Sequence, residues 1–278
     1  MGGQIYVSFS GGKDSTVLLD LVRRVYSNAP AVFVDTGLEY PEVREFAKSK
    51  ENVVVLKPEM NFRKVIETFG YPLISKQVAN TIEYANPGTI RWELLHGNLK
   101  KDNGKPSEFN CQQWAFLKEA PFKISSRCCT IMKKNPLHKY ERQTGLKPII
   151  GTMATESRQR RSQWLNNGCN SFDAKNPASK PLSFWTEQDI YAYLKRYHLS
   201  YASVYGDIVE DNKGVLCTTG CDRTGCVFCG FGCHLEKEPN RFQRLKETHP
   251  KLYEYCMKSW ENGGLGMKEV MAYINVPI

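Results

Sequence analysis

The chain has 278 residues, 41% of them hydrophobic and 24% charged, a globular balance that excludes a disordered protein and allows one large core with an appendage. Its formal charge of +9 favours an anionic partner such as a nucleotide, a sulfate or a nucleic acid, although a solvated basic surface would give the same charge. Because no apolar run reaches the roughly 18–20 residues of a membrane span, we expect a cytoplasmic protein without a membrane partner.

Short apolar segments alternate with amphipathic ones along most of the chain. The segments predicted as strands are 4–10, 31–36, 52–57 and 147–153. The segments predicted as helices are 13–27, 40–50, 61–69, 111–119, 136–144, 186–197, 239–260 and 266–274. Thr186 is a suitable N-cap, with Asp189 three residues on. This alternation predicts an α/β fold, an open parallel sheet with helices on both faces, whose ligand lies at the carboxyl ends of the strands.

The pattern changes near residue 205. We predict a nucleotide-binding domain over 1–205, interrupted by an insertion at about 73–120 with turns at "NPG" and "DNGKPS". Residues 206–278 are predicted to form a Cys-rich loop followed by a helical C-terminal extension.

The segment "SFSGGKDS" (residues 8–15, called the glycine loop below) lies between the first strand and the first helix. Such a junction directs backbone N–H groups and a helix N-terminus at an anion, and two glycines allow close backbone approach. Lys13 adds a cation, while Ser10 and Ser15 add hydroxyls. The loop is not a Walker A motif. A glycine turn with a Ser or Asp cap is the simpler alternative.

The glycine loop resembles the PP-loop of the N-type ATP pyrophosphatases and of the related phosphoadenylyl-sulfate (PAPS) reductases. The resemblance implies a PP-loop, Rossmann-like fold that binds an adenine nucleotide, with Lys13 and Asp14 as catalytic residues. The nucleotide contacts that it implies in this loop are Ser8, Ser10, Gly11, Gly12, Lys13, Asp14 and Ser15.

Two further segments are similar to signatures of the same family. "VFVDTGLEYPE" (32–42) is similar to the second-strand signature of the reductase branch, which implies that Asp35 and Thr36 lie beside the adenosine; the alternative is a strand-end aspartate that caps a turn. "GTMATESRQRR" (151–161) resembles the third signature. The contacts it implies are Gly151, Glu156 and Arg160.

The third signature departs from the family pattern at one position. Met153 stands where the family has an arginine, so the anion contacts of that arginine pass to another residue, with Arg158 and Arg161 as candidates.

Five of the ten cysteines fall between Cys217 and Cys233, a clustering that favours a metal site or catalysis over a disulfide framework. "RCCTIMKKNPL" (127–137) resembles a segment of cluster-bearing adenylyl-sulfate reductases, in which a tandem pair and a later C-x-x-C hold a 4Fe-4S cluster. The ligands thus implied are Cys128, Cys129, Cys226 and Cys229.

Other interpretations of the cysteines stay open. The related DNA-phosphorothioation branch draws its ligands from one run, here Cys217, Cys226, Cys229 and Cys233. Four thiolates also suit structural zinc. Isolated cysteines, expected to be packing residues, are Cys111, Cys169 and Cys256.

The resemblance implies two chemistries. In one, Mg²⁺-bound ATP adenylates a substrate, pyrophosphate leaves, and sulfur from a donor such as a cysteine desulfurase displaces AMP; nucleic acid is one candidate acceptor. In the other, a cysteine thiolate attacks adenylyl sulfate and sulfite is released. The retained Lys13 and the missing Glu-Cys-Gly-Leu-His segment favour the first. A nucleotide-binding redox sensor without turnover is a third interpretation.

Overall fold

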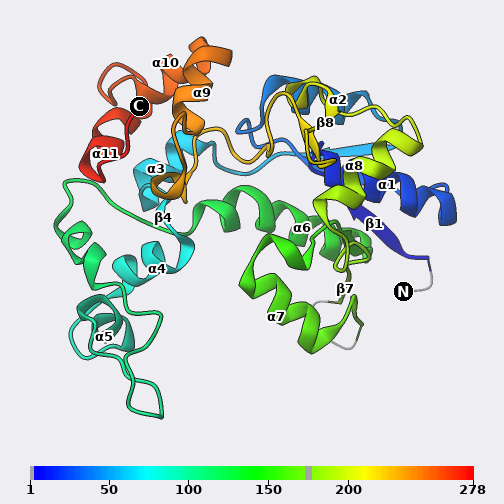
Figure 1. Cartoon of the computed structure of the whole chain (residues 1–278). Coiled ribbons are helices and arrows are strands. Elements are labelled where there is room, and N and C mark those ends of the chain that lie inside the picture. The colour runs from blue at the N-terminus through cyan, green and yellow to red at the C-terminus, as the bar shows by residue number, and fades with distance from the viewer. Residues whose placement is uncertain (1–2, 173–176) are drawn as a thin grey trace. The chain divides into compact units, whose positions relative to one another are not determined.

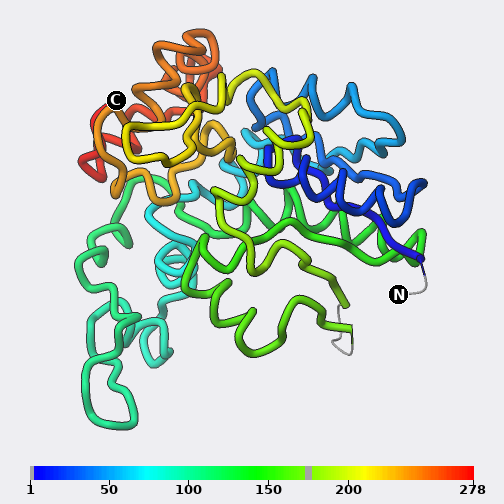
Figure 2. Tube along the Cα trace, turned by 45° about the vertical axis from the view of Figure 1, so that its right-hand side comes forward, coloured from blue at the N-terminus to red at the C-terminus, as the bar shows by residue number. Residues whose placement is uncertain are grey.

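The computed structural model describes residues 3–172 and 177–278 (Figure 1). The chain divides into two compact units, each built from two separate stretches. The first unit runs to Glu59 and resumes over Lys133–Gly225, and the second comprises Met60–Met132 and Cys226–Ile278. In the colour ramp of Figure 2, the first unit is blue and then green to yellow, and the second is cyan and then orange to red. The domain boundary at residues 205/206 stays a prediction.

The first unit contains the predicted parallel sheet. Its strands lie in the order β3-β2-β1-β5-β7-β6, and all pairs are parallel except β6 with β7. The strands are β1 Ile5–Ser8, β2 Ala31–Val34, β3 Val53–Leu56, β5 Lys147–Ile150, β6 Asn170–Ser171 and β7 Ala178–Ser179. A separate antiparallel pair joins β8 Ile208–Glu210 to β9 Leu216–Thr218.

Helices cover both faces of this sheet. They are α1 Lys13–Val25, α2 Pro41–Ser49, α6 Asn135–Thr144, α7 Arg158–Asn167 and α8 Glu187–Arg196, with 3₁₀ turns η3 Ala154–Glu156 and η4 Ser203–Tyr205. On β1, Ile5 and Val7 belong to the core that α1 and α8 complete. Tyr6 points to the opposite face, where its hydroxyl donates to Glu141 of α6 at 2.7 Å. The alternation along β1 therefore places helices on both faces, which confirms the predicted α/β class.

The second unit is mainly helical. Its elements are α3 Phe62–Phe69, β4 Leu73–Ile74, α4 Lys76–Tyr84, α5 Ile90–His96, η1 Gln112–Glu119, β10 Gly230–Phe231, η5 Cys233–Leu235, α9 Arg241–Thr248, α10 Pro250–Met257 and α11 Met267–Tyr273. A π-helical turn, η2 Thr130–Lys134, precedes α6. No helix within residues 3–172 and 177–278 is long and apolar enough to cross a membrane.

In the segment 111–119, Gln112–Glu119 form a 3₁₀ helix instead of the predicted α-helix. Two or three helices are predicted over 239–260 and 266–274, and the structure has three. The segment 239–260 contains both α9 and α10, because Pro250 has no N–H to continue the first helix and begins the second instead. The capping box of Thr186 and Asp189 is confirmed at the start of α8.

Residues 71–74 connect distant parts of the second unit. On one side, the Tyr71 N–H donates to the Lys123 carbonyl at 2.8 Å, and Ser125 donates back to Tyr71 at 3.0 Å. On the other side, β4 pairs with β10, and Gly232 donates to Ile74 at 2.8 Å. This extended segment, called the brace below, therefore joins the chain just before the tandem cysteines to the chain just after the C-x-x-C pair.

Gly11 shapes the turn from β1 into α1. Its φ of 74° lies in the left-handed region, and a Cβ there would lie 2.7 Å from the Val43 carbonyl oxygen of α2. The loop backbone can approach α2 this closely only because residue 11 has no side chain.

We expect Gly11→Ala to lower the free energy of unfolding more than Gly37→Ala. Gly37 has nearly the same φ, 73°, but its Cβ would meet none of the described atoms within 4 Å. Gly37→Ala should cost only the backbone strain of about 1–2 kcal/mol, whereas Gly11→Ala adds a collision with backbone. Urea titrations of both variants measure the difference; equal losses would contradict the close approach.

Candidate functional site

The glycine loop presents the N-terminus of α1 at the carboxyl end of β1. Gly12 is the N-cap residue, and because glycine has no side chain it gives the helix no side-chain hydrogen bond. Instead, the Lys13 N–H donates to the hydroxyl of Tyr205 at 3.2 Å, and that hydroxyl lies 2.6 Å from the hydroxyl of Thr224. Two neutral hydroxyls thus occupy a position where a helix N-terminus favours an anion.

The serines of the loop hold its backbone. The Ser10 N–H donates to the Ser15 hydroxyl at 3.2 Å, and that hydroxyl donates to the Gly12 carbonyl at 2.9 Å. Ser8, the last residue of β1, is half-buried. The hydroxyls of Ser10 and Ser15 lie 3.1 Å apart, so these hydrogen bonds hold the loop backbone in place without a ligand.

Lys13 is only 3% exposed. Its Nζ lies 2.9 Å from a Glu187 carboxylate oxygen and 3.4 Å from Asp14, and it donates to the Asp222 carbonyl at 3.3 Å. Burial alone would lower the pKa of Lys13, but the charges of Asp14 and Glu187 outweigh it and raise the pKa. The ammonium therefore stays charged beside the loop.

Asp14 faces the same small volume. Burial raises the pKa of its carboxyl most, the neighbouring Lys13 lowers it, and the negative charge of Glu156 raises it further. The site accordingly combines one buried cation with three acidic groups, those of Asp14, Glu156 and Glu187, at the ends of β1, β5 and the start of α8.

Asp35 and Thr36 follow β2, as expected, but both have partners inside the chain. The Asp35 carboxylate pairs with Arg44 at 2.8 Å and with Lys48 at 2.6 Å, both on α2. The Thr36 hydroxyl donates to Glu39 at 2.7 Å. The adenosine contacts expected of these two residues stay a prediction.

The third signature follows β5, the neighbour of β1 in the sheet. Gly151 packs against Leu18 of α1, where a Cβ would lie 3.4 Å from the Leu18 side chain. Glu156 accepts the Met153 N–H at 2.8 Å and forms an ion pair with Arg160. Met153, in the position of the missing arginine, is buried in the core.

The remaining cations of this signature face solvent. Arg158 and Arg161, the candidate stand-ins for the missing arginine, are both exposed at the start of α7.

Four partners of the loop were not predicted from the sequence. They are Glu187, Tyr205, Asp222 and Thr224. The turn "LSYASVY" shows a concentration of tyrosines, but nothing in its spacing indicates that one hydroxyl reaches the first helix. Only the tertiary fold brings these residues to Lys13.

The tandem pair Cys128 and Cys129 and the pair Cys226 and Cys229 all lie in the second unit. The brace accounts for this placement. The tandem pair follows residues 123–125, which bond to one side of the brace, and the C-x-x-C pair precedes β10, which pairs with the other side. Cys217, which the alternative ligand set requires, lies on β9 of the first unit. No disulfide joins any of the ten cysteines, all of which fall within the described ranges.

The thiols of the second unit affect one another. Burial raises the pKa of Cys229 to about 11, with further contributions from the charges of Cys226 and Cys129. Cys233 differs, since its thiol is buried and donates to the Gly230 carbonyl at 3.0 Å. Three of the four expected ligands are therefore electrostatic neighbours, whereas Cys233 is engaged in the protein's own packing.

The donor set fits a thiolate-bound metal or cluster in kind, because four cysteines of one unit supply the soft ligands that iron–sulfur clusters and zinc prefer. Across the described residues, no three His, Cys, Asp or Glu side chains are already arranged to hold a metal ion. The ligand assignment accordingly stays a proposal.

Comparisons with known proteins found a family model that matches most of the chain. The family model described as "Phosphoadenosine phosphosulfate reductase domain" matches residues 4–75 and 96–230. An uncharacterized protein of Methanocaldococcus jannaschii is 25% identical over 280 residues, covering 96% of this chain and 50% of that protein. This chain thus spans half the length of that relative.

Two further similarities concern named reductases. The adenosine 5'-phosphosulfate reductase of Lysinibacillus sphaericus is 27% identical over 202 residues, covering 72% of this chain and 67% of that enzyme. The solved phosphoadenylyl-sulfate reductase of Candida auris, in a phosphate complex, superposes with a TM-score of 0.40 at 15% identity, over 76% of this chain and 83% of that one.

We expect Asp35→Asn to destabilise the protein at neutral pH but not in acid. Burial alone would raise the pKa of Asp35, but hydrogen bonds from Lys48 and Arg44 outweigh it and lower the pKa. The stabilisation is therefore present at neutral pH and is lost as pH falls below about 4 through the lowered pKa.

Denaturant titrations at several pH values measure this effect, with an expected loss of about 1–2 kcal/mol at pH 7 that shrinks towards pH 3. Glu67→Gln, which removes an exposed pair with Lys64, is the control and should change little. A constant difference across the pH range would contradict the role of the Asp35 charge.

Proposed function

We propose, from the premise that this chain belongs to the phosphoadenosine phosphosulfate reductase domain family, that it binds ATP at the glycine loop and transfers sulfur to an adenylated acceptor. The family supports an enzyme that handles an adenine nucleotide. The nucleotide contacts proposed are those expected from the sequence, with Lys13 and Asp14 in the catalytic positions.

The buried Lys13 carries this proposal. A cation held at the N-terminus of α1 can stabilise negative charge that develops on departing phosphates. The neighbouring carboxylates of Asp14 and Glu187 keep it charged until a phosphate replaces one of them. Fixed charge of this kind costs no reorganisation during the reaction.

The hydroxyls of Tyr205 and Thr224 support an anion site at the same place. They satisfy the Lys13 N–H in the unliganded state, as a phosphate oxygen would in the bound state. We propose that ATP takes over this N–H and leaves the two hydroxyls to donate to its phosphate oxygens.

The proposed reaction has two steps. An acceptor oxygen attacks the α-phosphorus of ATP, forming an acceptor–AMP bond and releasing pyrophosphate. The terminal sulfur of a persulfide, the product of a cysteine desulfurase, then attacks the adenylated carbon, and AMP leaves with the oxygen. A thiol reductant attacks the donor's cysteine sulfur in the resulting disulfide, so that the acceptor keeps the transferred sulfur and the donor leaves as a mixed disulfide with that thiol. Mg²⁺ bound to ATP would supply charge neutralisation on the phosphates. Nucleic acid is the acceptor class that the basic composition favours.

The state of Cys256 favours this reaction over sulfite release. A reductase needs a mobile nucleophilic thiolate, but Cys256 is 0% exposed on α10, and burial raises its pKa well above the ordinary value. It has the burial of a packing residue.

A second candidate is reduction of adenylyl sulfate. The printed names of several relatives, all adenosine 5'-phosphosulfate reductases at 23–27% identity, favour it. The same loop and the same cation would then bind the nucleotide, and a different cysteine would attack sulfur. A nucleotide-binding redox sensor stays the alternative if neither nucleotide is consumed.

We also propose a 4Fe-4S cluster on Cys128, Cys129, Cys226 and Cys229, with zinc as the alternative occupant. Their placement in one unit on either side of the brace supports this set over the one that includes Cys217. A bound cluster would supply electrons or hold sulfur. The chain's own contribution is to fix the two cysteine pairs through the brace.

We expect the purified protein to release pyrophosphate from ATP and no sulfite from adenylyl sulfate supplied with thioredoxin. Lys13→Met should weaken ATP binding about tenfold and slow pyrophosphate release about 10²–10³-fold, because the phosphates lose their buried cation. Lys64→Met, at an exposed lysine, is the matched control.

Calorimetry with a non-hydrolysable ATP analogue separates binding from turnover. Thermal unfolding of Lys13→Met shows whether the variant is folded. Sulfite release from adenylyl sulfate would overturn the ATP reaction and establish the reductase, whether or not Cys256→Ser abolishes it.

We expect protein purified anaerobically to be brown and to contain iron and sulfide in cluster proportions. Cys129→Ser should remove the visible absorption and most of the iron, because it deletes a ligand. Cys233→Ser and Cys217→Ser should retain both. Loss of iron in Cys217→Ser with retention in Cys129→Ser would select the other ligand set, and colourless protein with stoichiometric zinc would exclude the cluster.

A further inference from the structure

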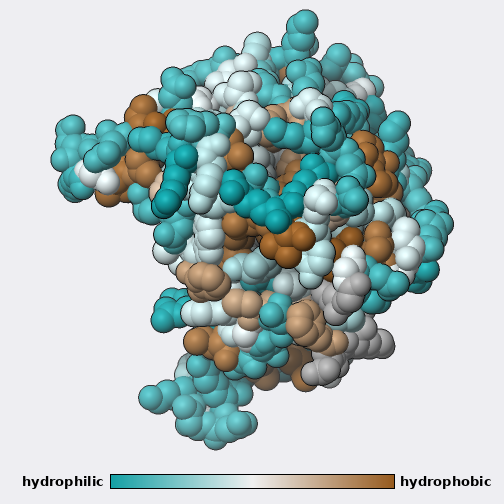
Figure 3. Space-filling view, turned by 90° about the vertical axis from the view of Figure 1, so that its right-hand side faces the viewer, coloured by the Kyte–Doolittle hydropathy of each residue, from teal (hydrophilic) through white to brown (hydrophobic). Residues whose placement is uncertain are grey.

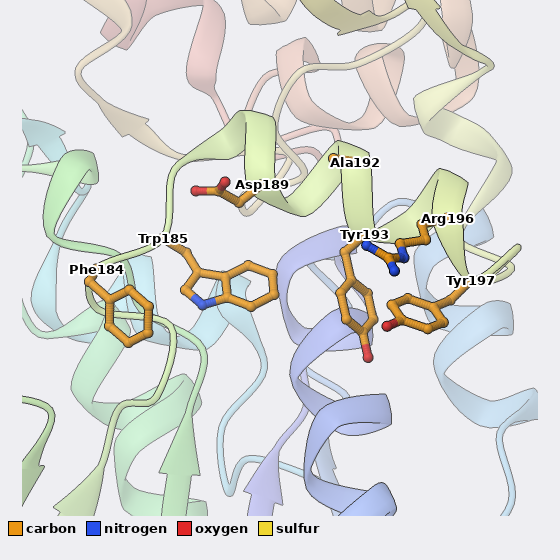
Figure 4. Close-up of a pocket in the computed structure, with 7 residues that line it drawn as sticks. All are labelled: Phe184, Trp185, Asp189, Ala192, Tyr193, Arg196 and Tyr197. Atoms are coloured by element: carbon orange, nitrogen blue, oxygen red, sulfur yellow. The ribbon is translucent and has the colours of Figure 1, made fainter.

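A row of aromatic side chains, contributed by α8 and by the residues directly before and after it, is not used by the nucleotide site. On the face of the molecule shown in Figure 3, hydrophobic side chains form separate patches between hydrophilic ones. An open pocket of about 390 Å³ lies along α8, and Figure 4 shows the side chains that surround it. Its lining residues are Phe184, Trp185, Asp189, Ala192, Tyr193, Arg196 and Tyr197.

The rings of this pocket, called the aromatic row below, follow one another along the helix. The Trp185 and Tyr193 ring centres are 5.7 Å apart, and those of Tyr193 and Tyr197 are 4.4 Å apart (Figure 4). Residues 189, 193 and 197 recur every four positions, so they share one face of α8. Phe184, at one end, is 62% exposed, and Tyr197, at the other, is 39% exposed.

Guanidinium groups border the Tyr197 end of the row. Arg24 of α1 lies over the Tyr197 ring, with 4.2 Å from its Cζ to the ring centre, and Arg196 lies 5.8 Å from the same ring. Asp20 holds this arrangement, because it accepts the Tyr193 hydroxyl at 2.7 Å and pairs with Arg24 at 2.7 Å. The rings are thus oriented before any ligand binds.

Asp189, the acidic residue in the lining, already accepts hydrogen bonds within the chain, which reduces its repulsion of an anion. The Asp189 carboxylate accepts both the N–H and the hydroxyl of Thr186, at 2.7 and 2.8 Å, as the cap of α8. Arg196, by contrast, forms no ion pair within 4.0 Å that the described residues show. Charge at the open end of the row is therefore positive.

We propose that the aromatic row binds single-stranded nucleic acid, with bases stacked on Tyr197 and Phe184 and backbone phosphate against Arg196. Aromatic faces accept every base, and arginines beside them attract phosphate, which together make a sequence-tolerant strand site. The chain's charge of +9 is complementary to such a partner. In a duplex the bases are paired and stacked inside the helix, so they could not stack on these rings.

The position of α8 relates the row to the glycine loop. Glu187, its first residue, pairs with Lys13, and Tyr197 lies about 15 Å further along the helix at 1.5 Å per residue. A strand on the row would thus extend away from the nucleotide site within one compact unit. That the bound strand is the sulfur acceptor rests on the proposed function; that the strand binds does not.

The test measures binding of a fluorescein-labelled single strand of about 12 nucleotides, as DNA and as RNA, by fluorescence anisotropy with the full-length protein. We expect Tyr197→Ala and Phe184→Ala each to weaken binding about tenfold. Arg196→Gln should reduce the slope of log affinity against log salt by about 0.7. Phe109→Ala, at a phenylalanine that is 53% exposed in the second unit, is the matched control and should bind normally.

Several results would overturn the proposal: no binding at about 50 mM salt, equal binding by all variants, or tighter binding of the matching duplex. A concentration-dependent dimer that Tyr197→Ala dissociates would also overturn it, because the row would then be a contact between copies. ATP binding is measured on the same samples. Lys13→Met should bind ATP about tenfold more weakly and bind the single strand normally, whereas Tyr197→Ala should bind the strand more weakly and ATP normally. Failure of this site and failure of the proposed function are therefore distinguishable.

Discussion

A lysine buried to 3% exposure has to keep its charge partnered, and this requirement at Lys13 organises the first unit. Its partners come from three places in the chain: Asp14 beside it, Glu187 at the start of α8, and the Asp222 carbonyl. The ion pair with Glu187 fixes α8 along α1. The aromatic row, the hydroxyl pair at the loop and the shape of the nucleotide site all depend on that placement.

The glycine loop and the sheet around it could be predicted because their signals are local. Apolar strands, glycines at a strand–helix junction and the Thr186 cap each occupy a few consecutive residues, and the structure confirms these elements. The partners of Lys13 could not be predicted, because a single glutamate, tyrosine or threonine far along the chain has no pattern. The position of the break between α9 and α10 is fixed by a local signal, Pro250, which begins the second helix.

The cysteine site likewise has features that could be predicted from the sequence and features that could not. The tandem pair and the C-x-x-C pair stand out in the sequence, yet the brace is what places them in one unit. Its strand β4 and the partner strand β10 have only two residues each. Strands this short have no detectable periodicity. The brace depends on backbone hydrogen bonds and on Gly230, where a Cβ would lie 2.7 Å from the Pro72 carbonyl oxygen.

The interleaving of the two units constrains how the protein is made. Neither unit is one continuous stretch, so the first lacks β5 and α8 until residues up to Arg196 have left the ribosome. The amphipathic helix α3 emerges earlier and waits for a segment synthesised almost last, since its Arg63 donates to the Trp260 and Gly263 carbonyls. At about 5–20 residues per second, the residues from the end of α3 to Trp260 take about 10–40 s to synthesise, a period in which chaperones can bind the exposed surface of α3.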